Sequence, residues 1–362
     1  MGGCVITKRF GLKGESPSIL IIALRFIGDV LVTTPLAVSI KKACPGAVID
    51  YLVFEGTEGV LAKNPLVRNV IKIPKKRKSA GIVFSLFRKY DLSIAAYPSD
   101  RTAIVAAIAG KQSIGLIYRD GKAWWKRLIL DRYCFCDDRL HVVSAMMSLA
   151  QGLGITPVPE AAAGYDEEDL AYARRNLPSG KYILMHPYSM NRVKYWPADK
   201  WRSLAALIHE RTDCRAVFTV TPSQGDRIYL DEILSGAPPE VMTYVSPTLN
   251  HFAAALKNCS AYVGIDTATT HIAAALEVPT IAIFGPTLTR YWAPWPNGCE
   301  DTSPFSLNKG VQHKAYVTVV QKDWECVPCN KESCRISDRN RMECLEALTA
   351  EEVLAELLPL LR

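Results

Sequence analysis

Residues 262–287 read YVGIDTATTHIAAALEVPTIAIFGPT, and this stretch decides the fold class that we expect. It begins with a short apolar strand, passes through the polar turn DTATTH at residues 266–271 and enters a helix at residues 272–276. A second apolar strand at residues 280–284 then stops before the sequence GPT. Two strands joined by a helix form a βαβ unit, and such units place their ligands at the carboxyl ends of the strands.

The polar turn supplies side chains that a ligand could use. Hydroxyls and backbone N–H groups at a helix N-terminus suit a phosphate or a pyrophosphate. Asp266 and His271 bracket the turn, and each could hydrogen-bond a bound nucleotide or sugar. The alternative is structural: Thr267 or Thr269 caps the helix, Asp266 accepts from turn amides, and His271 is a partly buried polar residue. In strand–turn–helix order, these residues together favour an anion site.

Length and composition describe an ordinary protein of two domains. The chain has 362 residues, of which 49% are hydrophobic and 22% are charged, and its formal net charge is +7. Chains of this length usually divide into two domains, and the positive charge favours anionic partners. The N-terminal residues lack the apolar core of a signal peptide, and no apolar run is long enough to span a bilayer. We therefore expect a cytoplasmic protein.

Strands alternate with helices in both halves of the chain. In the first half, strands are expected at residues 19–24, 48–54, 70–73 and 92–96, and helices at residues 29–42 and 102–109. In the second half, strands are expected at residues 182–186, 216–221 and 241–244, and helices at residues 200–211, 224–234 and 249–258. This alternation is typical of a parallel, doubly wound sheet.

A Pro- and Ala-rich segment divides the two halves. Residues 155–164 read ITPVPEAAAG, which is typical of a linker. We therefore expect an α/β protein with two Rossmann-like domains that face a central cleft. The first domain would span residues 1–160 and the second residues 161–349, and a last helix at residues 350–362 could pack back on the first domain.

Several common nucleotide-binding motifs are missing. Gly28 is the one glycine that follows the first strand, where the dinucleotide fingerprint needs three. The sequence contains no Walker A motif and no G-x-S-x-G motif. These observations argue against NAD and FAD enzymes and against P-loop phosphoryl transfer, and we expect no cofactor.

Two segments at predicted strand ends offer groups for chemistry. A carboxylate at Asp29 could take a proton from an incoming hydroxyl, and a well-placed general base contributes ~10²–10⁴ in rate. The alternative is that Asp29 caps the helix that it opens. In the second half, Ser189 and Lys194 follow a strand, and a lysine there could offset the negative charge of a departing diphosphate. The alternative for Lys194 is a solvated loop charge.

Five segments of the chain carry a resemblance to a known family. They are Arg25-Phe26-Ile27-Gly28-Asp29-Val30, Lys194-x-Trp196-Pro197, Asp266-Thr267-x3-His271, Phe284-Gly285-Pro286-Thr287, and a cysteine tail that closes on Cys344-Leu345. In this order and spacing the chain resembles glycosyltransferase family 9, the ADP-heptose:lipopolysaccharide heptosyltransferases. The resemblance covers nearly the whole chain, and its motifs are weak singly but strong together.

The resemblance implies a GT-B fold with an N-terminal acceptor domain and a C-terminal donor domain. It implies an inverting, metal-independent transfer of a heptose from ADP-heptose to the inner core of lipopolysaccharide. Asp29 then matches the general base, and Lys194 matches the group that stabilises the leaving phosphate. The positions that match the donor site are Ser189, Asp226, Asp266, Thr267, Ala268, His271, Gly285 and Pro286, and those on the acceptor side are Arg25, Gly28 and Arg101. Independently, the sequence contains no Asp-x-Asp pair, which fits a diphosphate site without a metal.

The chain departs from the family pattern at three places. Ala268 stands where a glycine is usual, and its methyl group would lie close to the donor. Residues 191–193 lack the acidic side chains that some members carry just before the lysine. Asp226 stands near the position at which many members have a glutamate that holds the ribose. These departures bear on the identity of the donor sugar more than on the assignment as a transferase.

Basic segments suggest an acceptor carried by a membrane. The run KKRK at residues 75–78 and the patch KAWWKR at residues 122–127 could meet anionic lipid head groups or core-sugar phosphates. We expect an acceptor in the lipopolysaccharide core or lipid A and a peripheral contact with the cytoplasmic face of the inner membrane. Reversing the charge of residues 75–78 should weaken liposome binding. The alternative is a solvated loop and a covering flap.

The sequence leaves three other functions to consider. A GT-B transferase that uses another nucleotide sugar for a different cell-surface glycan is the nearest. A non-catalytic metal or redox protein is a less favoured alternative, in which Cys326, Cys329, Cys334 and Cys344 would hold zinc or an iron–sulfur cluster. We expect no nucleic-acid partner, because the basic residues are dispersed and no recognition motif occurs.

Overall fold

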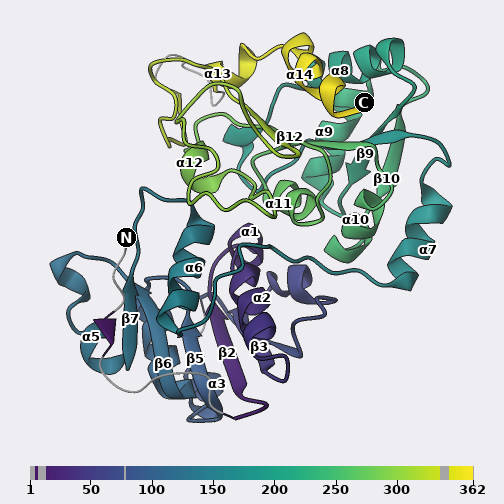
Figure 1. The fold of residues 1–362 in the computed structure, drawn as a ribbon. Helices are drawn as coiled ribbons and strands as arrows, with labels where there is room; N and C mark the ends of the chain where they lie inside the picture. The colour runs from purple at the N-terminus through teal and green to yellow at the C-terminus, as the bar shows by residue number, and fades with distance from the viewer. Residues whose placement is uncertain (1–4, 7–13, 77–78, 335–341, 362) are drawn as a thin grey trace. The chain divides into compact units, whose positions relative to one another are not determined.

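The computed structural model describes residues 5–6, 14–76, 79–334 and 342–361, which form two compact units (Figure 1). The first unit comprises Met1–Gly164 with Glu300–Thr302, and the second comprises Tyr165–Cys299 with Ser303–Arg362. Each unit contains its own seven-stranded sheet. Within the described part of the chain, no helix combines the length and the apolar character needed to cross a bilayer.

The first unit is built on a parallel sheet with one antiparallel edge strand. Its strands are β1 (Val5–Ile6), β2 (Ser18–Ala23), β3 (Val48–Phe54), β4 (Asn69–Ile73), β5 (Tyr90–Ala95), β6 (Gly110–Ile117) and β7 (Arg132–Phe135). Its helices are α1 (Ile27–Leu31), α2 (Thr34–Ala43), α3 (Ala80–Ser85), α4 (Asp100–Ala109), α5 (Lys126–Ile129) and α6 (Val142–Gly152), with short 3-10 helices η1 (Glu58–Leu61) and η2 (Gly121–Ala123). The strand order is β1-β7-β6-β5-β2-β3-β4, and β1 runs antiparallel to β7. Growth of the sheet reverses direction between β2 and β5, where a doubly wound sheet binds its ligand.

The helix expected at residues 29–42 is two helices. Helix α1 ends at Leu31 and α2 begins at Thr34, with Pro35 in its first turn. Proline has no N–H to continue the hydrogen-bond ladder of a helix, but it fits the start of one. The hydroxyls of Thr33 and Thr34 donate to the carbonyls of Val30 and Leu31, each at 2.7 Å, and so satisfy the end of α1.

The segment expected to be a linker is packed on the first unit. The Val158 amide donates to Ser39 Oγ at 2.8 Å, and the Ala162 amide donates to Thr34 Oγ1 at 2.9 Å. Asn64 Nδ2 donates to the Ala162 carbonyl at 2.8 Å. Because hydrogen bonds join this backbone to α2 and to the loop after η1, residues 155–164 are a packed part of the first unit. The passage to the second unit lies at Gly164 and Tyr165.

The second unit repeats the doubly wound pattern. Its strands are β8 (Tyr182–His186), β9 (Arg215–Val220), β10 (Met242–Val245), β11 (Ala261–Ile265), β12 (Thr280–Ile283), β13 (Gln312–Lys314) and β14 (Val317–Val320). Its helices are α7 (Glu167–Asn176), α8 (Ala198–Arg211), α9 (Gln224–Leu234), α10 (Leu249–Leu256), α11 (Ala268–Ala275), α12 (Thr289–Trp292), α13 (Glu343–Glu346) and α14 (Ala350–Leu357), with 3-10 helices η3 (Arg192–Lys194) and η4 (Leu358–Leu361). The strand order is β10-β9-β8-β11-β12-β14-β13, with β13 antiparallel. The switch point of this sheet lies between β8 and β11.

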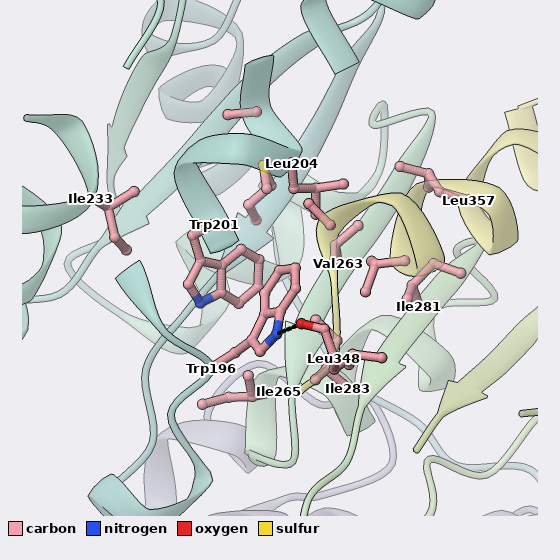
Figure 2. Packing of buried hydrophobic residues seen from close by; sticks show 14 of the residues in the cluster. Trp196, Trp201, Leu204, Ile233, Val263, Ile265, Ile281, Ile283, Leu348 and Leu357 are labelled. Carbon is pink, nitrogen blue, oxygen red and sulfur yellow. Dashed lines mark hydrogen bonds between the residues drawn. The ribbon is translucent and has the colours of Figure 1, made fainter. Parts of the chain in front are cut away.

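A tryptophan pair centres the core of the second unit (Figure 2). Trp196 and Trp201 are fully buried with ring centroids 5.1 Å apart, in an edge-to-face arrangement. Trp196 Nε1 donates to the Leu348 carbonyl at 3.0 Å, which satisfies the indole N–H inside the core. The motif Trp196-Pro197 therefore anchors the loop that follows β8 to the C-terminal segment.

The last helix belongs to the second unit. Helix α14 packs against α8 and also contacts β12 and β14. Its buried Val353, Leu354 and Leu357 lie in the same core as Trp196. The segment that was expected to pack on the first half is thus part of the second unit.

Candidate active site

The switch point of the second sheet brings Lys194 and Asp266 together. Lys194 ends η3, in the loop after β8, and Asp266 directly follows β11, which pairs with β8 in parallel register. Lys194 Nζ lies 2.7 Å from Asp266 Oδ2. The Asp266 side chain is 8% exposed and the Lys194 side chain 28% exposed, so the carboxylate is buried and the lysine is partly accessible to solvent. A cation held here by a buried carboxylate can exchange that carboxylate for a phosphate.

Helix α11 begins earlier than the sequence suggested. It was expected to start at residue 272, but it starts at Ala268, so that the polar turn is mostly the first turn of the helix. Thr267 is the residue before the helix and has extended backbone, and no described side chain caps this end. The first backbone N–H groups of a helix lack intrahelical partners, and the helix dipole adds positive potential there. This end of α11 therefore has the character of an anion site.

Two of the threonines in this turn are structural. Tyr262 OH lies 3.0 Å from Thr269 Oγ1 and 3.1 Å from Thr270 Oγ1, and all three side chains are buried. Thr270 Oγ1 also donates to the Ile265 carbonyl at 2.5 Å. These contacts fix the start of α11 against β11. The alternative that Thr269 caps the helix is wrong, because the Thr269 hydroxyl faces the core and contacts Tyr262 OH.

His271 is a buried neutral imidazole beside the ion pair. Burial lowers its pKa to about 4, the charge of Asp266 raises the pKa and the charge of Lys194 lowers it. Its Nδ1 atom has no hydrogen-bond partner among the described residues. A buried polar atom without a partner costs free energy unless a ligand or a water molecule satisfies it. His271 is therefore available to hydrogen-bond a ligand held at Lys194 and Asp266.

The loop after β8 is braced by α9. Asp226, in the first turn of α9, accepts from Tyr195 OH at 3.3 Å and from the Thr221 hydroxyl. Ser189 lies in the same loop, where its Oγ accepts from the Asn191 amide at 3.3 Å. In the structure, Asp226 is thus hydrogen-bonded to Tyr195, the residue that follows Lys194. Its contact with a ribose is a prediction.

The loop after β12 is held by the C-terminal tail. Gln321 Nε2 donates to the Gly285 carbonyl at 2.7 Å and to the Thr287 carbonyl at 3.0 Å. The Asn330 amide donates to the Pro286 carbonyl at 2.8 Å. A Cβ atom on Gly285 would lie 2.8 Å from Leu345 Cγ and Cδ1, closer than carbon atoms pack. A larger residue at position 285 would therefore force the Leu345 side chain to move.

The four cysteines of the tail differ in exposure. Cys326 is exposed, Cys329 and Cys334 are half-buried, and Cys344 is buried. Burial raises the pKa of the Cys344 thiol to about 12, and the other three thiols add to this shift. Within the residues that the structure describes, no group of three or more His, Cys, Asp or Glu side chains could hold a metal ion. The electrostatic effect of the other three thiols on Cys344 places them near it, and metal binding by these cysteines stays a prediction.

The switch point of the first sheet carries Arg25, Asp29 and Tyr97. Asp29 Oδ2 accepts from the Phe26 amide at 3.1 Å and lies 3.9 Å from Arg25 Nε. Tyr97 OH donates to the Asp29 carbonyl at 2.8 Å, and the Arg25 guanidinium lies 5.3 Å from the centre of the Tyr97 ring. Asp29 is therefore inside the first turn of α1, and its carboxylate caps the start of the helix by accepting from the Phe26 amide, as the structural alternative predicted. This contact fixes the position of the carboxylate at the carboxyl end of β2.

The other predicted acceptor residues have structural contacts. Gly28 lies inside α1, where its carbonyl accepts from the Val32 amide. Arg101, in the first turn of α4, donates to the carbonyls of Pro74 and Lys75 and to Ser79 Oγ, and so braces the loop that contains the basic run. Lys75 and Lys76 of that run are exposed, whereas residues 77–78 lie outside the described residues. The role of these residues toward an acceptor is a prediction.

Sequence reasoning missed Tyr97 and Tyr195. Tyr97 follows β5, the strand on the other side of the first switch point, and Tyr195 directly follows Lys194. The signal for Tyr97 was its place after a predicted strand, which is the same signal that singled out Asp29. Nothing in the sequence pairs Tyr195 with Asp226, because the two lie on different elements.

The chain is similar to several known proteins. The model of the family "Glycosyltransferase family 9 (heptosyltransferase)" matches residues 83–324. The chain is 27% identical over 292 residues to lipopolysaccharide heptosyltransferase 3 of Escherichia coli, covering 76% of this chain and 85% of the relative. It is 27% identical over 335 residues to lipopolysaccharide heptosyltransferase 1 of Pseudomonas aeruginosa, covering 87% of each chain.

Solved structures share the fold. A family 9 glycosyltransferase from Veillonella parvula superposes with a TM-score of 0.76 at 20% identity, covering 97% of this chain and 99% of its own. The expected α/β GT-B fold with two Rossmann-like units is confirmed.

Proposed function

The chain belongs to glycosyltransferase family 9, the heptosyltransferases, and from this premise we propose that it transfers a heptose from ADP-heptose to the inner core of lipopolysaccharide. The curated relatives carry the name lipopolysaccharide heptosyltransferase. The observation that carries the proposal is the cluster of Lys194, Asp266 and His271 at the open N-terminus of α11. It supplies a cation, helix N–H groups and a free imidazole nitrogen, which suit a diphosphate and its sugar.

In the proposed donor site, Lys194 changes partner. In the structure its ammonium pairs with Asp266 at 2.7 Å. The diphosphate of the donor would compete for that ammonium, and Asp266 would then accept from a sugar hydroxyl. As the bond between the anomeric carbon and the diphosphate breaks, negative charge grows on the leaving oxygen. Lys194 and the N-terminus of α11 stabilise that charge, so the reaction needs no essential metal in this proposal.

Asp29 is the proposed general base. Its carboxylate removes the proton from the acceptor hydroxyl, whose oxygen attacks the anomeric carbon and inverts its configuration. The Phe26 amide fixes Oδ2 at 3.1 Å, and Arg25 lies 3.9 Å away on the solvent side, 46% exposed. Arg25 could orient an anionic group of the acceptor, such as a carboxylate or a phosphate. Since the acceptor is lipid-linked in this proposal, the enzyme would act at a membrane surface.

The test is transfer from ADP-heptose to a truncated lipopolysaccharide acceptor in the presence of EDTA, with wild type beside Asp29→Asn. Product from wild type and a loss of ~10²-fold or more in the variant would support a metal-independent transferase with Asp29 as base. Equal activity of the two proteins would show that Asp29 only accepts the Phe26 amide. If wild type releases no ADP from any ADP-sugar, the donor assignment is wrong, and other nucleotide sugars are then compared.

A further inference from the structure

The first unit exposes large apolar side chains on three neighbouring helices and on residues that flank them. The crossovers β4–α3–β5, β5–α4–β6 and β6–α5–β7 all step in the same direction along the sheet. Because parallel crossovers are right-handed, the three helices cover the same face of the sheet. Helices α3 and α5 each contact α4, so the three form one continuous layer.

The outward side of this layer is apolar. Among the large hydrophobic residues, Phe84 is 67% exposed, Phe87 63%, Trp124 61% and Leu128 75%. Phe84 and Phe87 lie on or next to α3, and Trp124 and Leu128 lie on or next to α5. Ile104 is on α4, the helix that contacts both, and it is also exposed. We call these five residues the apolar face. The neighbouring Val83, Leu86, Ala123 and Leu130 are buried in the core of the unit, so the helices are apolar toward the core and also toward solvent.

The sequence around the apolar face is strongly basic. Residues 63–139 contain seventeen Lys and Arg against six Asp and no Glu, whereas the whole chain has a net charge of +7, so the rest of the chain is net negative. Arg88, Lys89, Lys122 and Arg127 are exposed beside the apolar face. None of these four forms an ion pair with another residue that the structure describes. Their charge is therefore available to an anionic surface.

From this combination we propose that the apolar face binds an anionic lipid bilayer, with its apolar side chains in the boundary between head groups and acyl chains. Tryptophan favours that boundary. Apolar side chains contribute by burying area in the membrane, and the cations beside them contribute by attraction to anionic lipid head groups. A protein partner fits less well, because it would need acidic groups placed to match the flanking cations, whereas an anionic bilayer presents negative charge over its whole surface. The proposal rests on the proposed function in one respect, since a lipid-linked acceptor gives the contact its purpose.

The apolar face is held rigidly in place. Lys126 of α5 is buried, and its Nζ donates to the Pro98 carbonyl at 2.9 Å and pairs with Asp100 at 2.8 Å. This fixes α5, with Trp124 and Leu128 on either side of Lys126, to the start of α4. A bilayer contact made by a fixed surface loses little conformational entropy, which favours binding by a few side chains.

Flotation with lipid vesicles tests the proposal without any sugar substrate. The full chain is mixed with vesicles of phosphatidylglycerol and phosphatidylcholine, or of phosphatidylcholine alone. The variant Phe84→Ser/Leu128→Ser should bind the anionic vesicles about tenfold or more weakly, since binding scales with the apolar area buried. The matched control is Ile228→Ser/Leu307→Ser, which removes two residues of the second unit that are 61% and 59% exposed. It should bind as wild type does.

Charge and insertion have separate readouts. Lys122→Glu/Arg127→Glu should weaken binding to anionic vesicles only, by about fivefold or more for each charge removed at low salt. Acyl chains brominated near the head group should quench part of the tryptophan fluorescence of wild type, and Trp124→Phe should remove that part. Equal binding of the apolar and control variants, or no binding by wild type at low salt, would overturn the proposal. Self-association lost in Phe84→Ser/Leu128→Ser would assign the face to a second copy instead.

Failure of this proposal is distinguishable from failure of the proposed function. Transfer to a water-soluble, deacylated acceptor should be the same in wild type and in Phe84→Ser/Leu128→Ser. Transfer to an acceptor embedded in vesicles should fall in the variant alone. Vesicle binding without any transfer would refute the heptose assignment and leave the membrane contact standing.

Discussion

His271 lies beside two opposite charges, yet burial keeps its pKa at about 4, far below the ordinary value. His186, at the end of β8, has a pKa of about 3 for the same reason, and its Nδ1 lies 2.7 Å from Thr219 Oγ1. Both imidazoles are therefore neutral at physiological pH. A neutral His271 can hydrogen-bond a sugar hydroxyl without attracting a second proton into the proposed donor site.

The two histidines predict a loss of stability in mild acid. The unfolded chain binds protons near pH 6.5, whereas the folded protein resists protonation of His271 down to about pH 4. The free energy of unfolding should therefore fall as the pH drops from 6.5 toward 4. At 1.36 kcal/mol per pKa unit, His271 contributes on the order of 3 kcal/mol at most. Urea unfolding at pH 7.5 and pH 5.5 measures the effect, which His271→Gln should reduce. The exposed His209→Gln is the control, and an equal pH dependence in both variants would contradict the assignment.

Lys194 should act mainly on the chemical step. Lys194→Gln removes the charge that we propose stabilises the leaving diphosphate, and we expect kcat to fall by ~10²–10³-fold with a smaller change in KM. Arg192→Gln is the matched control, because Arg192 is an exposed cation of the same short helix. We expect it to be close to wild type. A similar loss of kcat in both variants would mean that the positive charge of the loop matters and that the position of Lys194 does not.

At the scale of elements, the loop after β12 depends on its contact with the C-terminal tail. Gly285→Ala places a methyl group 2.8 Å from Leu345 and should destabilise the protein by about 1–3 kcal/mol through overpacking. Leu345→Ala alone should cost about 2–5 kcal/mol by leaving a cavity. In the double variant, the smaller side chain at 345 makes room for the methyl group. Its destabilisation, measured by chemical unfolding, should therefore be less than the sum of the two.

Gly180→Ala is the control for this cycle, because nothing lies within 4 Å of a Cβ atom there. Its free energy of unfolding should stay close to that of wild type. Additive losses in the Gly285 and Leu345 pair would show that the loop is not supported by this contact.

At the scale of the whole molecule, the alternation of strands and helices predicted the fold, because continuous apolar runs of five to seven residues are typical of buried parallel strands. The strands at 48–54 and 182–186 have the expected bounds. Strand β6 was missed because it follows α4 without a turn, with Gly110 as both the helix cap and the first strand residue. Helix α6 was missed in a stretch where no motif called for one.

The candidate site was predictable only in part. Asp29, Lys194 and Asp266 were found because each follows a predicted strand. Their partners depend on which strands are neighbours in the sheet, and sequence order does not give this. The pairing of Lys194 with Asp266 requires β8 to lie beside β11, although 74 residues (187–260) lie between the two strands. The packing of residues 155–164 was likewise hidden, because its bonds to Thr34 and Ser39 join distant parts of the chain.

That packed segment gives a last prediction, on how the chain leaves the first unit. Asn64 is buried and donates to the Ala162 carbonyl, while the amides of Val158 and Ala162 are bound by hydroxyls of α2. Asn64→Ala removes one anchor, and a lost hydrogen bond of about 1 kcal/mol should speed hydrogen exchange at Val158 and Ala162 about fivefold. Asn69→Ala changes an exposed asparagine of β4 and should leave both amides protected. Fast exchange of these amides in wild type would mean that residues 155–164 behave as the linker that their composition suggests, whereas slow exchange requires a first unit that ends at Gly164.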